Sequence, residues 1–417
     1  MKVLVSAYAC DPYLGSEPGV GWTAVCRIAR QHDVWVLSHA RHEEGWEKAR
    51  REGKVPSNVT VRFLGDNKPW LENRFLAHLQ SWKSYTDFSG IVLDAAQAWH
   101  REIGFDLCHQ VTIATWRVAS PLWKLPIPFV WGPIGGGGYI PPAFRPMLSP
   151  LARGFELARD FNSSRALQAK SFQECIGNSA VVFAANEETE LLLKPHRGNR
   201  PLVKLPIASI PPEKVEKFRR PETSKSEGPL RLFAGGNMEG RKGVSLALRA
   251  LAKVATAGID FRYTVAGGGP EVPALMKLTK DLGLTDRVEF HPGFSGQDYV
   301  SALQATDIYF LPSFRESTPV TLLEAYLAGC YPVVADTSAQ GEIVRMAGGS
   351  AVPVTSMEQL IDGLAEAIIE SARRRTELPA LLAESLKKLI AYFDSSRYDQ
   401  AIADAYRIAM ESQPRSR

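Results

Sequence analysis

The chain opens two separate segments with the same succession of elements: a short apolar strand, a glycine-rich turn, an amphipathic helix and a second apolar strand. In the first segment these elements are expected at residues 2–8, 15–21, 22–30 and 34–37. In the second they are expected at residues 230–234, 235–236, 244–257 and 261–266. A strand, a crossover helix and a second strand form a βαβ unit, and such units build parallel sheets. The sequence therefore predicts an α/β protein of two Rossmann-like domains, which we expect to face each other across a cleft.

The length of the chain and a cluster of prolines place the boundary between these domains. A chain of 417 residues suits two domains that each bury a core of their own. Several prolines between residues 201 and 228 are expected to break regular structure there, as in a linker. We therefore predict an N-terminal domain over residues 1–205 and a C-terminal domain over residues 206–395. The last helix, residues 396–417, is a candidate to pack back on the N-terminal domain.

Composition argues against several classes of function. The formal net charge is only +4, from 49 basic and 45 acidic residues, so no nucleic-acid partner is predicted, whereas a small anionic ligand fits. Five scattered cysteines show no metal-ligand spacing, so we predict no metal site and a reducing compartment. The first apolar run is too short for a secretory signal, and no stretch approaches the roughly 20 apolar residues of a membrane span. A cytoplasmic protein is predicted, with peripheral association at the inner face of a membrane left open.

The stretch from residue 314 to residue 329 is the most informative for chemistry. It follows an apolar strand, so it is expected at the carboxyl end of a parallel sheet, where ligands of such sheets bind. Thr318 is suited to cap a helix that Gly329 closes, with Pro319 in its first turn. The backbone N–H groups of Val320 and Thr321 would then be unpaired and could bind a phosphate.

Two carboxylates flank this expected anion site. Glu316 lies in the loop before the helix, and Glu324 lies in the second turn of the helix. Carboxylates accept hydrogen bonds from paired hydroxyl groups, which a ribose and a transferred sugar both present. Taken alone, two glutamates at this spacing are more often solvated helix residues. Their position between a strand and a glycine-closed helix favours a binding site.

With these residues the chain resembles the retaining family 4 glycosyltransferases, which have the GT-B fold. Glu316-x7-Glu324 is similar to the E-x7-E signature of that family. Further stretches resemble other family motifs in the same order along the chain: residues 15–22 the N-terminal glycine loop, residues 106–110 and 131–137 the central motifs of a subgroup, residues 240–243 the basic donor loop, and residues 341–344 the stretch after the next strand. This ordered set is more specific than any one motif.

The resemblance implies a role for each matching residue. Glu324 is expected to bind the donor ribose and Glu316 the hydroxyls of the transferred sugar, while Lys242 and Arg241 neutralise the diphosphate. His109 resembles the histidine that family members place near the reacting sugar. Gly15 is expected to let the backbone approach the donor phosphate, and Gly236 and Glu17 are further donor-side candidates. The donor is expected mainly on the C-terminal domain and the acceptor mainly on the N-terminal domain. Gly135, Gly136 and Gly137 are the acceptor-side candidates.

The reaction implied is metal-independent transfer of a hexose-like sugar from a UDP- or GDP-sugar, with retention. The acceptor is expected to be a saccharide or a lipid-linked sugar in polysaccharide or glycolipid assembly. No cofactor is implied and no enzymic nucleophile is required, because retaining members are thought to use the leaving phosphate to deprotonate the acceptor.

One departure from the family pattern keeps alternatives open. The family usually has an arginine where this chain has Gly236, and diphosphate stabilisation is weaker unless Arg241 takes over. A non-catalytic, sugar-nucleotide-binding relative would explain this glycine. A nicotinamide-dependent oxidoreductase would explain the glycine turns, but residues 34–39 lack the acidic residue expected at the end of the second strand. A sugar-nucleotide epimerase on the same fold is a third alternative.

Overall fold

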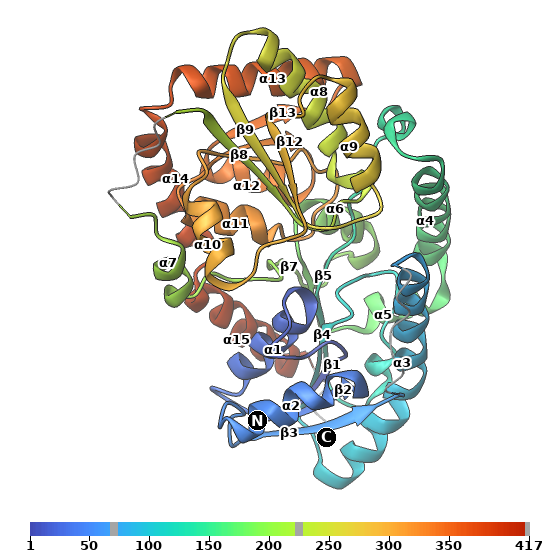
Figure 1. Ribbon diagram of the computed structural model, residues 1–417. Coiled ribbons are helices and arrows are strands. Elements are labelled where there is room, and N and C mark those ends of the chain that lie inside the picture. The colour runs from blue at the N-terminus through green and yellow to red at the C-terminus, as the bar shows by residue number, and fades with distance from the viewer. Residues whose placement is uncertain (67–73, 222–227, 413–417) are drawn as a thin grey trace. The chain divides into compact units, whose positions relative to one another are not determined.

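The computed structural model describes residues 1–66, 74–221 and 228–412, and within these the chain forms two α/β units (Figure 1). Unit 1 contains Met1–Gly137, Phe161–Ala208 and Ser396–Arg417, of which residues 413–417 lie outside the described part. Unit 2 contains Gly138–Asp160 and Ser209–Ser395. The segment Gly138–Asp160 thus belongs to unit 2, although the residues before and after it in the sequence belong to unit 1. A single domain boundary at residue 205 does not describe this division.

Unit 1 is built on a seven-stranded, all-parallel sheet in the order β3-β2-β1-β4-β5-β6-β7. Its strands are β1 (Lys2–Ala7), β2 (Asp33–His39), β3 (Val59–Leu64), β4 (Leu107–Thr112), β5 (Phe129–Ile134), β6 (Val181–Ala184) and β7 (Leu202–Lys204). Its helices include α1 (Ser16–Ile28), α2 (Glu43–Arg51), α3 (Arg74–Ile103), α5 (Lys170–Asn178), α6 (Glu187–Arg197) and α15 (Ser395–Glu411), and α4 (Pro150–Gln168) crosses the division between the units.

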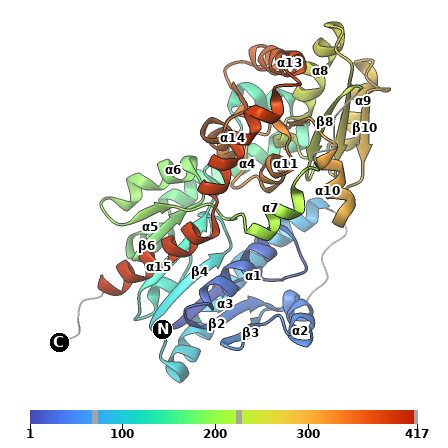
Figure 2. The same cartoon turned by 90° about the vertical axis from the view of Figure 1, so that its left-hand side faces the viewer.

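Helices cover both faces of this sheet, because successive side chains of a strand point to opposite sides. Val3 and Val5 of β1 pack with residues of α1 and α15, whereas Leu4 between them packs with residues of α3 and α5. The segment of α15 lies beside α1 in both cartoon views (Figure 2), and Arg27 of α1 forms a 3.0 Å ion pair with Asp399 of α15. The final helix is thus part of unit 1.

Unit 2 repeats the same topology with six parallel strands in the order β10-β9-β8-β11-β12-β13. The strands are β8 (Leu230–Gly235), β9 (Phe261–Ala266), β10 (Val288–His291), β11 (Ile308–Phe310), β12 (Tyr331–Asp336) and β13 (Ser350–Pro353). One group of packed helices contains α8 (Val244–Thr256), α9 (Val272–Asp281) and α13 (Met357–Arg373), and another contains α7 (Pro212–Phe218), α10 (Gly296–Gln304), α11 (Val320–Leu327), α12 (Ser338–Ala347) and α14 (Leu378–Tyr392) (Figure 1).

Both sheets contain the strand order 3-2-1-4-5-6 of a Rossmann fold, counted within each unit, and in unit 1 β7 is added beside the sixth strand. In unit 2 the order reverses between β8 and β11, and ligands of such sheets bind at the carboxyl ends of the strands at this point. The loops after β8 and β11 are the ones that carry Lys242 and Glu316. The topology therefore brings two stretches about 70 residues apart in sequence to the same edge of one sheet.

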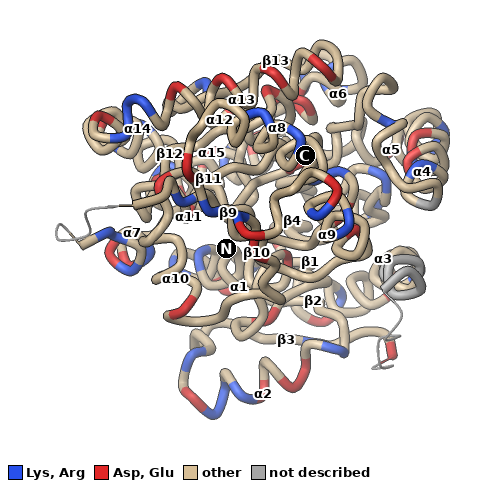
Figure 3. Tube along the Cα trace, turned by 45° about the horizontal axis from the view of Figure 1, so that its top comes forward, with Lys and Arg blue, Asp and Glu red and all other residues tan. Residues whose placement is uncertain are grey.

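The interpretation of residues 201–228 as an unstructured linker was wrong in part, because β7 and α7 lie there; proline is tolerated in the first turn of α7. Residues 222–227 lie outside the described part. Acidic and basic side chains are interspersed over both units, as along α2 (Figure 3). Among the described residues, no helix is both long and apolar enough to cross a membrane.

Candidate functional site

The loop that follows β8 is held in place by glycine at its end. A short 3-10 turn, Gly240–Lys242, leads to Gly243, whose φ of +67° lies in the left-handed region. A Cβ atom on Gly243 would lie 2.2 Å from the carbonyl oxygen of Pro312, so glycine is required on steric grounds as well. This close approach places Lys242 directly beside the chain that follows β11.

Lys242 and Arg241 converge on the carboxylate of Glu316. The Lys242 Nζ lies 2.6 Å from Glu316 Oε1, and Arg241 Nη1 lies 3.4 Å from the same oxygen. The Ser313 hydroxyl donates a third hydrogen bond to Oε1, at 2.8 Å. Only 13% of the Glu316 side chain and 10% of the Lys242 side chain are exposed, so these charges interact with little screening by water.

The electrostatics of this cluster favour the charged forms of Glu316 and Arg241. Burial by itself would raise the pKa of Glu316, but the Lys242 and Arg241 cations lower that pKa below its ordinary value. Burial would likewise lower the pKa of Arg241, but the carboxylates of Glu316 and Glu239 raise it. The loops after β8 and β11 therefore hold two cations and one carboxylate at one point, where an anionic ligand could exchange partners with them.

Glu324 lies in the second turn of α11, as the sequence indicated, and both of its oxygens have partners. Tyr299 of α10 donates its hydroxyl to Oε2 at 2.7 Å, and Lys214 of α7 lies 2.8 Å from Oε1. Burial and the nearby Glu324 charge raise the pKa of Tyr299 well above its usual range, so Tyr299 stays a hydrogen-bond donor. An ionised carboxylate accepts about four hydrogen bonds, which leaves Glu324 able to receive a diol as well.

The start of α11 differs from the expected cap. Thr318 does not occupy the N-cap position, which is held by Pro319, and the N–H of Val320 donates to the Thr318 carbonyl at 3.0 Å. The prediction that the Val320 N–H is unpaired was therefore wrong, because the chain turns tightly before the helix. Of the two backbone N–H groups, that of Thr321 stays a candidate for binding a phosphate.

Gly236 occupies the position where the family pattern has arginine. Its φ is +132°, a conformation that side chains rarely adopt, and a Cβ atom there would lie 3.4 Å from Lys242 Nζ. The Lys242 ammonium group thus lies beside the space that a side chain at position 236 would enter. Glycine here accommodates the Lys242–Glu316 pair.

His109 is a core residue of unit 1. It is fully buried in β4, with Nε2 2.7 Å from the Gly132 carbonyl oxygen and Nδ1 2.8 Å from the Tyr406 hydroxyl. Because a carbonyl can only accept, Nε2 carries the proton and Nδ1 accepts from Tyr406. Burial lowers the pKa of His109 to about 4. Both ring nitrogens are occupied, so the expectation that His109 acts next to the sugar has no geometric support here.

Glu17 and Gly15 lie at the corresponding edge of the unit 1 sheet. Glu17 accepts hydrogen bonds from the Ala114 N–H at 2.7 Å and from the Tyr85 hydroxyl at 2.6 Å, so it ties α1 to the loop after β4 and to α3. Gly15 is the N-cap of α1, and a Cβ atom on it would meet nothing within 4 Å. The protein itself does not require glycine at position 15.

The acceptor-side glycines form an ordered loop within unit 1. The Gly135 N–H donates to the Ala114 carbonyl at 3.1 Å, and the Gly136 carbonyl accepts from Arg117 at 2.7 Å. The Gly137 N–H donates to the Thr189 hydroxyl at 3.1 Å. These three glycines therefore have partners inside unit 1, and close packing against Arg117 and Thr189 explains the absence of side chains at positions 136 and 137.

Part of the chain that carries this geometry matches a known family model. Residues 215–380, which contain Arg241, Lys242, Glu316 and Glu324, match the family model described as "Glycosyl transferases group 1". These residues are thus similar to a group 1 glycosyltransferase domain. The sequence-based resemblance to family 4 glycosyltransferases is confirmed at the level of this domain.

Individual relatives agree with this result over part of their length. The chain is 34% identical over 129 residues to a 2-deoxystreptamine glucosyltransferase of Streptomyces kanamyceticus, covering 31% of this chain and 33% of that protein. It is 31% identical over 194 residues to a D-inositol 3-phosphate glycosyltransferase of Saccharomonospora viridis, covering 43% of each. The matched segments thus span a third to less than half of these curated relatives.

Solved structures show that the fold is GT-B. The sucrose-phosphate synthase of Thermosynechococcus elongatus superposes with a TM-score of 0.69 over 99% of this chain and 100% of that one, at 14% identity. Anabaena HepE, solved in complex with UDP, gives a TM-score of 0.66 over 98% of this chain and 100% of that one, at 17% identity. The predicted pair of Rossmann-like α/β domains is therefore confirmed.

Several residues that contact Glu316 and Glu324 were not found from the sequence. Tyr299, Lys214 and Ser313 contact the two glutamates but belong to no motif, and Lys214 lies in the segment interpreted as a linker. Ser313 is three residues before Glu316, so a search for side chains able to reach Glu316 within one turn would have included it. For Tyr299 and Lys214 the sequence offers no comparable signal, because only the fold brings α10 and α7 to α11.

Proposed function

We propose that the protein is a retaining, metal-independent glycosyltransferase that moves a hexose-like sugar from a UDP- or GDP-sugar to a saccharide or glycolipid acceptor. The convergence of Lys242 and Arg241 on Glu316, at the strand-order reversal of the group 1 domain, is the observation that carries this proposal. Solved structures of Anabaena HepE with UDP and with UDP-glucose support a nucleotide-sugar donor for this fold.

In the proposed complex, the donor binds along the edge of the unit 2 sheet. Glu324, held by Tyr299 and Lys214, accepts hydrogen bonds from the ribose hydroxyls. Lys242 and Arg241 contact the diphosphate, and Glu316 accepts from hydroxyls of the sugar. Glu316 then exchanges part of its contact with the two cations for contact with the sugar, while the cations gain the phosphate oxygens as partners.

The chemistry that this arrangement supports is the departure of a nucleoside diphosphate. The bond between the sugar C1 and the β-phosphate oxygen breaks, and negative charge develops on that oxygen. Cations fixed in a poorly hydrated site stabilise such charge more than they stabilise the ground state, which lowers the barrier. The acceptor oxygen bonds to C1 on the same face, and its proton passes to the departing phosphate.

A thermal-shift screen tests the donor. The purified protein and its Glu324→Ala variant are heated with UDP-, GDP- and ADP-glucose, and with NAD and NADP as controls. A ligand that binds only the folded state raises the melting temperature, by a free energy of about 2.7 kcal/mol at 100 times its Kd. We expect one sugar nucleotide to stabilise the wild type and to lose this effect in the variant. A response only to NAD or NADP would refute the proposal and favour the oxidoreductase.

Turnover separates the enzyme from a binding-only relative. Release of the nucleoside diphosphate is followed with a panel of saccharide and lipid-linked acceptors, and the product is examined for the configuration at C1. Retention in a new glycosidic bond supports the proposal. Donor binding without nucleotide release for any acceptor would indicate the non-catalytic relative, and a changed sugar without acceptor would indicate an epimerase.

A further inference from the structure

The segment Gly138–Asp160 packs on the loops that carry the proposed donor-binding residues. Although it lies in the sequence between two stretches of unit 1, it belongs to unit 2, where Phe144 is part of the hydrophobic core. The Phe144 ring packs against the Phe314 ring with 4.9 Å between centroids, and Phe314 is two residues before Glu316. We call Gly138–Asp160 the arm.

The arm also contacts the basic donor loop. Leu148 fills the space beside Gly240, where a Cβ atom would lie only 2.5 Å from the Leu148 Cδ2. The next residue, Ser149, donates its hydroxyl to Glu271, just before α9, at 3.0 Å. One face of the arm thus contacts both loops at the edge of the sheet, the one after β8 and the one after β11.

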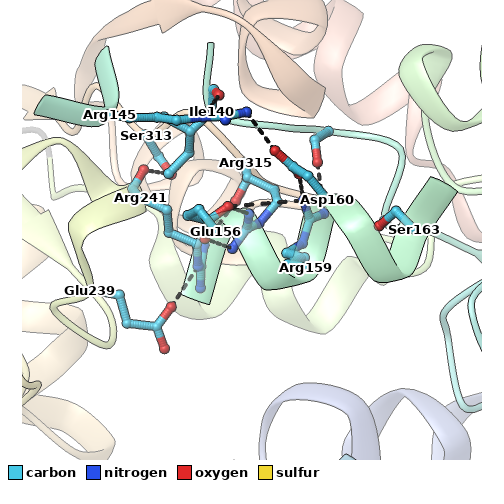
Figure 4. A network of polar contacts seen from close by, with 12 residues as sticks. Ile140, Arg145, Glu156, Arg159, Asp160, Ser163, Glu239, Arg241, Ser313 and Arg315 are labelled. Carbon is cyan, nitrogen blue, oxygen red and sulfur yellow. Dashed lines mark hydrogen bonds and ion pairs between the residues drawn. The ribbon is translucent and has the colours of Figure 1, made fainter. Parts of the chain in front are cut away.

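An ion pair fixes the end of the arm to the residue before Glu316. Arg315 binds both carboxylate oxygens of Glu156, at 2.6 Å and 3.0 Å, and Glu156 is only 8% exposed (Figure 4). A two-pronged pair of this kind fixes orientation as well as distance. Arg159, one turn further along α4, lies 4.0 Å from Glu156, so a second cation faces the same carboxylate.

Hydrogen bonds and an ion pair within the arm hold its parts together, so the arm can act as a rigid support. Arg159 donates to the Gly138 carbonyl at 2.8 Å, which joins the two ends of the arm. Arg145 pairs with Asp160 at 2.5 Å and donates to the Ile140 carbonyl at 3.4 Å (Figure 4). These contacts link both ends and the middle of the arm.

A hydrogen bond to the Arg315 main chain connects the arm to Arg241, one of the two cations of the proposed donor site. Arg241 donates to the Arg315 carbonyl at 2.8 Å, and the Phe314 N–H donates to the Arg241 carbonyl at 2.8 Å. A shift of Arg315 would therefore move Arg241 and Glu316 together. We propose that Glu156 is a positioning residue of the donor site: through Arg315 it holds Arg241 and Glu316 in place for the diphosphate and the sugar.

This inference rests on the proposed function, and its test uses ligands that differ in which part of the site they reach. Affinities of the full-length protein for UMP, UDP and UDP-glucose are measured by calorimetry, or for the guanine series if the screen selects it. UMP can contact Glu324 through its ribose but has neither a β-phosphate nor the hexose that is transferred. We expect Glu156→Gln to weaken UDP and UDP-glucose binding by about tenfold and UMP binding by less than twofold, because the amide keeps the shape but loses the charge.

A double-variant cycle shows whether Glu156 acts through Arg315. Glu156→Gln, Arg315→Gln and the combination are compared, and we expect the double variant to bind UDP no more weakly than Arg315→Gln alone. Asp362→Asn is the matched control, because it removes a carboxylate that pairs with Lys253 on an exposed part of unit 2. It should change none of the three affinities.

The outcomes separate the two proposals. Wild-type binding of UDP-glucose that Glu324→Ala removes, with no selective loss in Glu156→Gln, would overturn the role of Glu156 and leave the proposed function in place. Equal losses for UMP, UDP and UDP-glucose would reduce Glu156 to a purely structural residue and also overturn the inference. Absence of any nucleotide binding by the wild type would overturn both.

Discussion

Removing the Lys242 charge should destabilise the protein because it leaves Glu316 buried with weaker compensation. The two charges lie 2.6 Å apart, which corresponds to an attraction of about 6 kcal/mol at an effective dielectric constant of about 20. Desolvation of both groups offsets most of this, and loss of one partner of a buried pair typically costs about 3–5 kcal/mol. Arg241 and the Ser313 hydroxyl still contact Glu316, so we expect Lys242→Met to cost about 2–3 kcal/mol.

The decisive comparison is with the double variant Lys242→Met/Glu316→Gln. It removes both charges, and Arg241 keeps Glu239 as a partner at 2.6 Å, so no unpaired buried charge is created. We expect the double variant to lose less than about 1 kcal/mol relative to the wild type. The single variant should therefore be the less stable of the two, although it carries fewer substitutions.

Thermal unfolding followed by calorimetry at pH 7.5 measures this difference. For a unit of about 200 residues, about 2–4 °C of melting temperature corresponds to each kcal/mol, so Lys242→Met should melt about 4–12 °C lower. Lys253→Met is the control, since Lys253 pairs with Asp362 where both side chains are more than 40% exposed, and exposed pairs of this kind contribute little to stability. A double variant as unstable as Lys242→Met would refute the argument, because the loss would then come from packing rather than charge.

Three further predictions concern Tyr299, Gly236 and His109. Tyr299→Phe should weaken UDP binding about tenfold in a calorimetric titration, because it removes a hydrogen bond to the Glu324 charge; unchanged affinity would contradict a role for Tyr299 in holding Glu324. Gly236→Arg should lower both stability, by about 1–3 kcal/mol, and UDP affinity, because φ is +132° and the new side chain meets Lys242; a gain in affinity would show that the missing arginine is simply a lost ligand. His109 should make stability fall as pH drops from about 6.5, by about 1.4 kcal/mol per pH unit, because the unfolded chain binds a proton that the folded protein excludes until its pKa of about 4. Urea unfolding of the wild type and His109→Gln between pH 7 and pH 4.5 checks this, and equal slopes for the two proteins would rule out the assignment.

The sequence predicted the fold well because both halves of the chain obey local rules. Buried parallel strands read as short runs of Val, Leu and Ile, and glycine turns mark the ends of the first strand of each unit. These signals placed β1, β2, β8 and β9 correctly. They could not reveal that Gly138–Asp160 joins unit 2, because its prolines and apolar residues carry no local mark of which core they enter.

The candidate site was predictable where it depends on strand ends and not where it depends on helix contacts. Lys242 and Glu316 follow β8 and β11, and the parallel topology is enough to bring them together. The role of His109 could not be predicted in this way. The sequence around a histidine in a buried strand is the same whether its side chain contacts a ligand or a tyrosine of the core. The partner that decides the matter, Tyr406, is almost 300 residues away in α15, so only the fold can identify it.

The contacts around Glu316 and Glu324 indicate how the proposed donor site holds its carboxylates in a fixed orientation. Each glutamate has a lysine and a neutral hydroxyl as partners: Lys242 and Ser313 for Glu316, Lys214 and Tyr299 for Glu324. A hydroxyl donor orients a carboxylate without neutralising it, whereas the ammonium group can turn towards an incoming phosphate. Removal of Ser313 or Tyr299 should therefore loosen the orientation of a glutamate, and removal of a lysine should change the charge that the donor meets. If both kinds of variant affected donor affinity with the same salt dependence, this division of roles would be wrong, because only the loss of a cation should reduce the salt dependence of binding an anion.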